Sequence, residues 1–386
     1  STLPPAYSEP DASAPEEEPV IFRRPDTLSG VQLTAGVEYL TKAGDSAETV
    51  KEQIDAALAF AKEWGFNTLL VPLAYDGKLP FAVDGVETYT LQDKSGAAFD
   101  PIAYILEAGR AQDMYLYGVL DLRVREDKEW DPTVPADAAR MHALAEGAAA
   151  RYAFDGWLIT GYSYPTKAQG DAEAFAASGA GRTMEQFMAD SVQTAVADVA
   201  ATLRAANRNG YIGLLTSPVW AHKSVDARGS DTAGVYEEYT DGHADSLSWI
   251  QNGLVDFIML QGDRSTNQAN ASFNTVLDWW AGVCTGANLP FYVLQASDKA
   301  AAGESGFGGD QMARQYLACQ KTAGWGGSAF TSLAALQKNT GDFATVLRRA
   351  LTGGIDTEYT FKSLTFSAPT SNTVTTDESK FTFMGS

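Results

Sequence analysis

Two patterns of apolar residues take turns along most of this chain. Short continuous apolar runs are typical of strands buried on both faces, and each is followed by a segment with apolar residues at helical spacing. The runs predict strands at residues 32–42, 66–73, 115–124, 155–162, 211–217, 255–261, 290–295 and 327–332. The spaced segments predict helices at residues 47–65, 100–113, 135–152, 184–207, 244–252, 273–283, 310–323 and 340–351.

This regular alternation of strand and helix predicts an α/β fold, the (β/α)₈ or TIM barrel. A doubly wound sheet is the alternative. No Gly-x-Gly-x-x-Gly motif follows the first predicted strand, so the sequence lacks the dinucleotide-binding signature of that fold.

The two ends of the chain differ in composition from the middle. Residues 1–28 begin with a segment rich in Pro, Ser and Glu and poor in apolar residues, which is typical of a disordered tether. Residues 29–352 hold the predicted barrel. Residues 353–386 are rich in Thr, Ser and Phe with short alternating stretches, so we expect a β-rich tail or the lead-in to a further domain.

Charge and composition exclude several classes of function. The 386 residues carry a formal net charge of −21, which disfavours nucleic acid as a partner. Cys284 and Cys319 are the only cysteines and are expected to be free buried thiols, and the three histidines are scattered, so we predict no metal site and no cofactor. No apolar run approaches the length of a membrane span.

Barrel enzymes place their chemistry where strands end, so acids at these points are the candidates. Glycoside hydrolysis uses two carboxyl groups that face each other across the bond. Glu38 ranks first because its apolar context would raise its pKa, and Asp121 and Asp263 follow. A pairing with Arg123 is the structural alternative for Glu38 and Asp121, and a turn position is the alternative for Asp263 and for Asp76.

Aromatic and amide side chains at strand ends are the second resource of a sugar site. Sugar rings stack on aromatic faces, and amides bond sugar hydroxyls. The candidates for substrate binding, together with Arg123, are Tyr39, Tyr75, Tyr162, Tyr164, Trp220, Gln261 and Gln295. Ordinary packing in the core or at the rim is the alternative for each aromatic residue.

Several stretches of the sequence resemble the glycosyl-hydrolase-like family ten, whose members are bacterial envelope-associated TIM-barrel proteins and often lipoproteins. The most specific is Ala-Asp-Ser-Leu-Ser-Trp-Ile-Gln-Asn-Gly-Leu-Val-Asp-Phe-Ile-Met-Leu-Gln at residues 244–261. The others are residues 99–124, residues 155–165, Thr-Ser-Pro-Val-Trp at 216–220 and Gly-Ser-Asp-Thr at 229–232. The resemblance covers about residues 30–350 and implies a barrel that acts on or binds envelope glycans, with peptidoglycan glycan strands as the associated substrate.

The sequence departs from the family pattern at the strand tips. The fourth strand of the family usually ends in two aspartates before a tyrosine, whereas this chain has Thr160 and Gly161 before Tyr162. Pro72 stands at a family arginine position, and Leu120-Asp121 replaces an Asn-Pro pair, although Arg123 is kept.

Two hypotheses therefore remain, with a third behind them. The chain is a glycoside hydrolase with a rearranged acid pair, Glu38 with Asp121 or Asp263, or it is a catalytically inactive barrel that binds carbohydrate. A surface scaffold whose partner is protein is the third. The resemblance and the tether predict an extracellular or cell-surface bacterial lipoprotein, with a lipid anchor upstream of residue 1.

Overall fold

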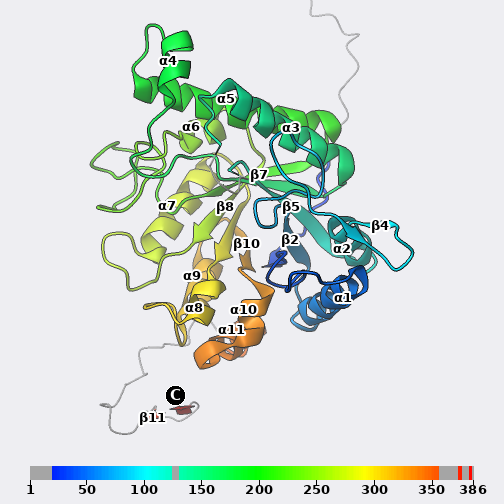
Figure 1. Ribbon diagram of the computed structural model, residues 1–386. Coiled ribbons are helices and arrows are strands. Elements are labelled where there is room, and N and C mark those ends of the chain that lie inside the picture. The colour runs from blue at the N-terminus through cyan, green and yellow to red at the C-terminus, as the bar shows by residue number, and fades with distance from the viewer. Residues whose placement is uncertain (1–19, 124–129, 356–372, 376–381, 385–386) are drawn as a thin grey trace, which may run out of the picture.

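The computed structural model describes residues 20–123, 130–355, 373–375 and 382–384. Eight parallel strands close into a barrel, as the sequence predicts (Figure 1). Going round the barrel, they are β1 (Leu28–Gln32), β2 (Thr68–Pro72), β5 (Tyr115–Asp121), β6 (Gly156–Thr160), β7 (Tyr211–Thr216), β8 (Phe257–Gly262), β9 (Phe291–Gln295) and β10 (Trp325–Phe330). Pairing of β1 with both β2 and β10 closes the ring.

Helices surround this barrel on the outside (Figure 1). They are α1 (Ala47–Glu63), α2 (Pro101–Arg110), α3 (Pro135–Arg151), α4 (Ala172–Ser178), α5 (Met184–Ala206), α6 (Ser246–Gln251), α7 (Phe273–Gly286), α8 (Ser297–Ala302), α9 (Gln311–Lys321), α10 (Leu333–Lys338) and α11 (Phe343–Leu351), with a 3₁₀ turn η1 (Thr340–Asp342). Side-chain caps explain several starts. Ser46 accepts from the Thr49 amide before α1, and Thr183 forms a capping box with Gln186 before α5.

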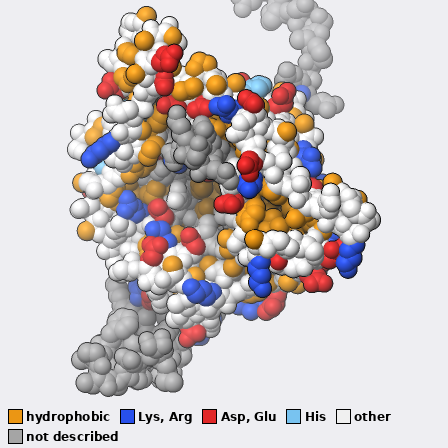
Figure 2. Space-filling model, viewed as in Figure 1, with side chains coloured by type: hydrophobic (Ala, Val, Ile, Leu, Met, Phe, Trp, Pro, Cys, Tyr) orange, Lys and Arg blue, Asp and Glu red, His pale blue; other side chains and the backbone are white. Residues whose placement is uncertain are grey.

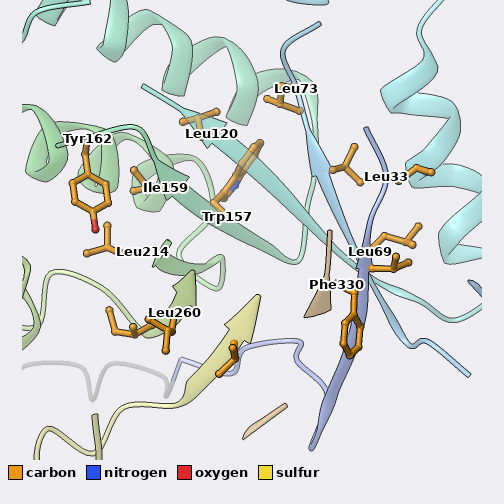
Figure 3. Close-up of a cluster of buried hydrophobic side chains, with 14 of the residues drawn as sticks. Leu33, Leu69, Leu73, Leu120, Trp157, Ile159, Tyr162, Leu214, Leu260 and Phe330 are labelled. Carbon is orange, nitrogen blue, oxygen red and sulfur yellow. The ribbon is translucent and has the colours of Figure 1, made fainter. Parts of the chain in front are cut away.

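Alternate side chains of each strand enter two separate cores. The barrel interior is filled by Leu28, Leu70, Tyr117, Val119, Leu158, Tyr211, Phe257, Met259, Tyr292, Leu294 and Ala329. The intervening residues point outward and pack with the helices. Figure 3 shows part of this outer layer, with Leu69, Leu120, Trp157, Ile159, Leu214, Leu260 and Phe330 among its members. The interior is therefore a packed core, and ligands meet the barrel only at its ends.

The first strand lies earlier than the sequence pattern suggests. The prediction of a strand at residues 32–42 was wrong beyond Gln32, because the chain turns there: Gly36 and Leu40 have φ of 83° and 53°, and the Glu38 amide donates to Thr34 O. Positive φ cannot continue an extended strand. Glu38 consequently lies in a loop.

Three short helices also escaped the sequence pattern. They are α4, in the connection between β6 and α5, and α8 and α10, which follow directly after β9 and β10. Each is only a turn or two long, which is too short for helical periodicity to be recognised. The long connection between β2 and α2 holds a short antiparallel pair, β3 (Leu91–Gln92) and β4 (Ala98–Phe99).

The described part of the expected tether lies against the amino-terminal end of the barrel. The Arg23 guanidinium donates to Asp155 Oδ2 at 2.5 Å and lies 4.7 Å over the Tyr115 ring. The Phe22 ring lies 5.0 Å from that of Tyr211. Tyr115 and Tyr211 are the first residues of β5 and β7, so this segment covers the floor of the barrel.

Within the expected β-rich tail the structure describes residues 353–355 and an antiparallel pair, β11 (Thr373–Thr375) and β12 (Thr382–Met384). Cys284 and Cys319 are free and buried. Among the described residues, no helix has the length and apolar character of a membrane span. The same residues contain no cluster of three His, Cys, Asp or Glu side chains that could hold a metal ion.

Candidate active site at the carboxyl end of the barrel

The last inward-facing position of most strands forms a polar layer above the apolar interior. The alternation that puts Leu28, Val119, Leu158, Met259 and Ala329 inside also turns inward the residues that follow them at the mouth. These are Gln32, Pro72, Asp121, Thr160, Gln261, Asp263 and Thr331. Two of the three predicted acids, Asp121 and Asp263, belong to this layer, and the amide of Gln261 lies beside Asp263.

Asp263 follows β8 directly and is half-buried. Its Oδ2 accepts from Gln261 Nε2 at 3.4 Å, whereas its buried Oδ1 has no hydrogen-bond partner among the described residues. Burial raises the pKa of this carboxyl, the positive charges of Arg264 and Lys299 oppose the rise, and Asp298 adds to it. Burial therefore makes the protonated form of Asp263 easier to reach than that of an ordinary aspartate.

Asp121 is the last residue of β5, and its side chain is exposed. Strands β6 and β7 separate it from β8, so Asp121 and Asp263 approach the mouth from well-separated sides. The hydrogen bond between Asp121 and Arg123 joins the carboxylate Oδ1 to the Arg123 backbone amide at 2.9 Å. Arg123 itself is half-buried at the start of the following loop.

Glu38 is placed differently from the two aspartates. It is 8% exposed, its Oε2 accepts from the Thr34 amide at 2.7 Å and its Oε1 accepts from the Ala334 amide at 2.8 Å. Burial raises the pKa of the carboxyl, and these amide donors work against the rise. The carboxylate therefore fastens the β1 loop to the start of α10, and its two oxygens are already engaged by fixed donors.

Tyr162 and Tyr164 lie in the core beneath the loops. Both are buried, and Figure 3 shows Tyr162 within the outer apolar layer. The Tyr162 hydroxyl donates to Glu238 Oε1 at 2.8 Å, and the Tyr164 hydroxyl donates to Asp131. These bonds connect the loop after β6 with the loops after β7 and β5, so both tyrosines hold loops together.

The other aromatic and amide candidates divide by exposure. Tyr39 and Trp220 are fully buried, and Trp220 stacks on Trp279 with ring centroids 5.8 Å apart. Gln295 is fully buried on the outer face of β9, where its Nε2 donates to Met312 O. Gln261 is exposed, and Tyr75 is half-buried against Tyr89. Of these candidates, Gln261 and Tyr75 have surface that a ligand could reach.

Sequence reasoning missed Glu238, which lies in the long loop between β7 and α6. It is fully buried and accepts from the Tyr162 hydroxyl, the Ser217 amide at 2.7 Å and the Ser246 hydroxyl at 2.6 Å. Burial raises its pKa to about 7 against the effect of these donors. Glu237 and Glu238 stand side by side in a polar loop, which in sequence is typical of solvated charge.

Asp298 was also missed. It lies in the first turn of α8, and its Oδ1 accepts from the Thr331 hydroxyl at 2.5 Å. Because α8 was not predicted, the search for acids at strand ends did not include this residue.

Figure 2 shows acidic and basic side chains interspersed on the face of the molecule seen in Figure 1.

No protein-family model matches the chain. The chain is 22% identical over 300 residues to the glycosyl hydrolase YngK of Bacillus subtilis, which covers 68% of this chain and 59% of YngK. It is 26% identical over 167 residues to the glycosyl hydrolase DigH of Escherichia coli, which covers 42% of this chain and 38% of DigH. The matches thus span about three fifths of YngK and less than half of DigH.

Solved structures share the fold at lower identity. The catalytic domain of a β-amylase from Paenibacillus polymyxa has a TM-score of 0.54 at 10% identity and covers 81% of this chain and 93% of that one. A β-galactosidase from Rahnella sp. R3 also has a TM-score of 0.54, at 11% identity, and covers 86% of this chain and 58% of that one. These likenesses agree with the closed eight-stranded barrel.

Proposed function

We propose that this chain is a glycoside hydrolase that binds a carbohydrate at the carboxyl end of its barrel, with Asp263 as the general acid and Asp121 as the opposing carboxylate. The observation that carries the proposal is the pair of inward-facing carboxyls above a closed apolar interior, one at the tip of β5 and one just after β8. The similarity to proteins named glycosyl hydrolases supports it.

The two environments suit the two roles. A general acid needs a proton at the working pH, and burial raises the pKa of Asp263. Asp121 is exposed to solvent, which suits a carboxylate that activates water or attacks the sugar. Gln261 is exposed beside Asp263 and supplies an amide for a sugar hydroxyl.

Glu38 has no part in this pair. Its two oxygens accept from backbone amides on β1's loop and on α10, and a protonated carboxyl would give up one of those bonds. Both acid pairs that the sequence suggested include Glu38, and we propose Asp121 with Asp263 in their place because both aspartates stand at the barrel mouth.

A carbohydrate-binding barrel without catalysis is the second candidate. Thr160 and Gly161 favour it, because the tip of β6 supplies no carboxyl group of its own. The substrate class belongs to the proposal as well: the family resemblance points to peptidoglycan glycan strands or another envelope polysaccharide, and to a lipid-anchored protein at the bacterial surface.

The test is incubation with peptidoglycan glycan strands and a panel of polysaccharides, with products followed by mass spectrometry and binding by calorimetry. We expect Asp263→Asn and Asp121→Asn to lower turnover by roughly 100-fold or more. Glu38→Gln should retain activity, and so should Asp76→Asn, whose exposed side chain lies in a turn with φ of 51°.

Binding without product would replace hydrolysis with the binding function. Absence of both binding and product across the panel would contradict the proposal and favour the scaffold. Activity that survives Asp263→Asn would remove Asp263 as the acid.

A further inference from the structure

A glycine stands where the tips of β5 and β6 meet. Asp121 pairs in register with Thr160, and the Leu122 amide donates to Thr160 O at 2.9 Å, so the two tips stay joined beyond the last pair. Gly161 comes next and has φ of +67°. The chain therefore turns away from the barrel at a residue without a side chain.

The carboxylate of Asp121 occupies the space that a side chain at this glycine would need. A Cβ atom at Gly161 would lie 1.9 Å from Asp121 Oδ1 and 3.0 Å from its Cγ. Non-bonded heavy atoms settle at about 3.5–4 Å. The same Oδ1 accepts from the Arg123 amide at 2.9 Å, which holds the carboxylate in this position.

We infer that Gly161 is a positioning residue for Asp121. Because Gly161 has no side chain, the carboxylate of Asp121 on β5 can lie across the tip of β6. The tip of β6 therefore has a carboxylate beside it, although its own residues there are Thr160 and Gly161. The placement of the Asp121 carboxylate rests on the contacts above, and its expected effect on turnover rests on the proposed function.

The consequence concerns where the acid stands. Any side chain at residue 161 has to push the Asp121 carboxylate aside and breaks its bond to the Arg123 amide. A displacement of about 1 Å in a reacting group can lower a rate by about 100-fold. Gly161→Ala should therefore lower turnover, or glycan affinity in a binding barrel, to the level of Asp121→Ala.

Stability measurements test the geometry without any substrate. Gly161→Ala combines backbone strain with the clash, whereas the control Gly65→Ala, at φ +77° with nothing within 4 Å of the added Cβ, carries strain alone. We expect Gly161→Ala to lower Tm more than Gly65→Ala does. In an Asp121→Ala background the difference between the two decreases should shrink, because only the 3.2 Å approach of the added Cβ to Leu122 N then remains. An unchanged difference in that background would overturn the inference.

An exchange variant tests the position of the acid. Asp121→Gly combined with Gly161→Asp moves the carboxylate onto β6 itself, and aspartate is among the residues that tolerate positive φ. We expect the exchange to restore turnover that Asp121→Gly loses. If the wild-type protein is active and Gly161→Ala keeps full activity, the inference is contradicted while the proposed function stays intact. If the wild type neither binds nor cleaves any glycan, the proposed function fails, and the Tm comparison alone decides.

Discussion

Three carboxyl groups near the mouth share a pKa raised by burial but differ in their partners. Glu38 and Glu238 are surrounded by donors that engage both of their oxygens. Asp263 differs, because its buried Oδ1 has no partner among the described residues. A carboxyl whose two oxygens are held by fixed donors is structural, whereas the one hydrogen bond described for Asp263 is a 3.4 Å contact from the exposed Gln261. This distinction at the level of single atoms selects Asp263 over Glu38.

Glu238 makes the stability of the protein depend on pH. Its pKa is about 7 in the folded protein against an ordinary value of 4.5, so between these values the folded state holds a proton that the unfolded chain has lost. The contribution of this group to the free energy of unfolding is therefore highest below pH 4.5. It falls by at most about 3 kcal/mol as the pH rises towards 7, and it stays level above that. Denaturant unfolding across pH 5–8 should show a shallower decrease for Glu238→Gln, whereas Glu146→Gln, exposed on α3, should behave as the wild type. An identical slope in Glu238→Gln would contradict this assignment.

Glu38→Gln gives a second prediction at this scale. The glutamine amide would present N–H groups to the Thr34 or Ala334 amide, so one acceptor is lost. We expect the free energy of unfolding to fall by about 1–3 kcal/mol, measured by urea titration, while turnover on a glycan substrate is retained. Loss of turnover with unchanged stability would restore Glu38 as the acid.

At the scale of elements, three loops above the barrel are fastened by the tyrosines that the sequence assigned to a ligand. Tyr162 connects the loop after β6 to Glu238, and Tyr164 connects it to Asp131 in the loop after β5. From the loop after β7, the Tyr236 hydroxyl donates to Tyr164 O at a distance of 2.6 Å. The rim of the mouth on this side is therefore one connected unit.

Removing either hydroxyl should loosen this unit. We expect Tyr162→Phe and Tyr164→Phe each to lower the free energy of unfolding by about 1–2 kcal/mol, since each leaves a carboxylate without one donor. Tyr104→Phe is the matched control, because its hydroxyl bonds the exposed Asp55 on the barrel wall. Equal, small effects in all three variants would show that the loops are not fastened in this way.

Most of the barrel strands, but only part of the candidate site, could be predicted from the sequence. The barrel strands after β1 were predictable because each is a largely apolar run between turn residues. The end of β1 was not, since the apolar residues Val37, Tyr39 and Leu40 continue past the strand while positive φ values at Gly36 and Leu40 turn the chain. Asp121 and Asp263 were found by their places at strand ends. Glu238 and the Gly161 contact depend on loop geometry, which a single sequence does not carry.

For the whole molecule, the barrel has one covered end and one polar end. Phe22, Arg23 and Arg24 lie on the floor, where Arg24 is 5.5 Å over the Tyr211 ring. The acids and amides lie at the opposite end. In barrel enzymes, the amino-terminal end of the barrel typically contributes to stability and the carboxyl end carries the active site.

Contacts on the floor should contribute to stability alone. We expect Arg23→Ala to lower the free energy of unfolding by about 1–3 kcal/mol, because Asp155 is largely buried and loses its ion pair. Ile21→Ala is the control, since Ile21 is 74% exposed. Thermal unfolding and glycan binding measured side by side would separate stability from function, and a loss of binding at unchanged Tm would contradict a purely structural floor.

The proposed function requires a carbohydrate to bind at the mouth of the barrel between Asp121 and Asp263. A crystal structure of Asp263→Asn with a glycan that the panel identifies tests it most directly, because this variant should bind its substrate without cleaving it. We expect a sugar ring in the polar layer, with contacts to Gln261 and to the Asp121 carboxylate. A glycan seated elsewhere, such as the groove of about 460 Å³ between α3 and α5 beside His142 and Arg182, would contradict it.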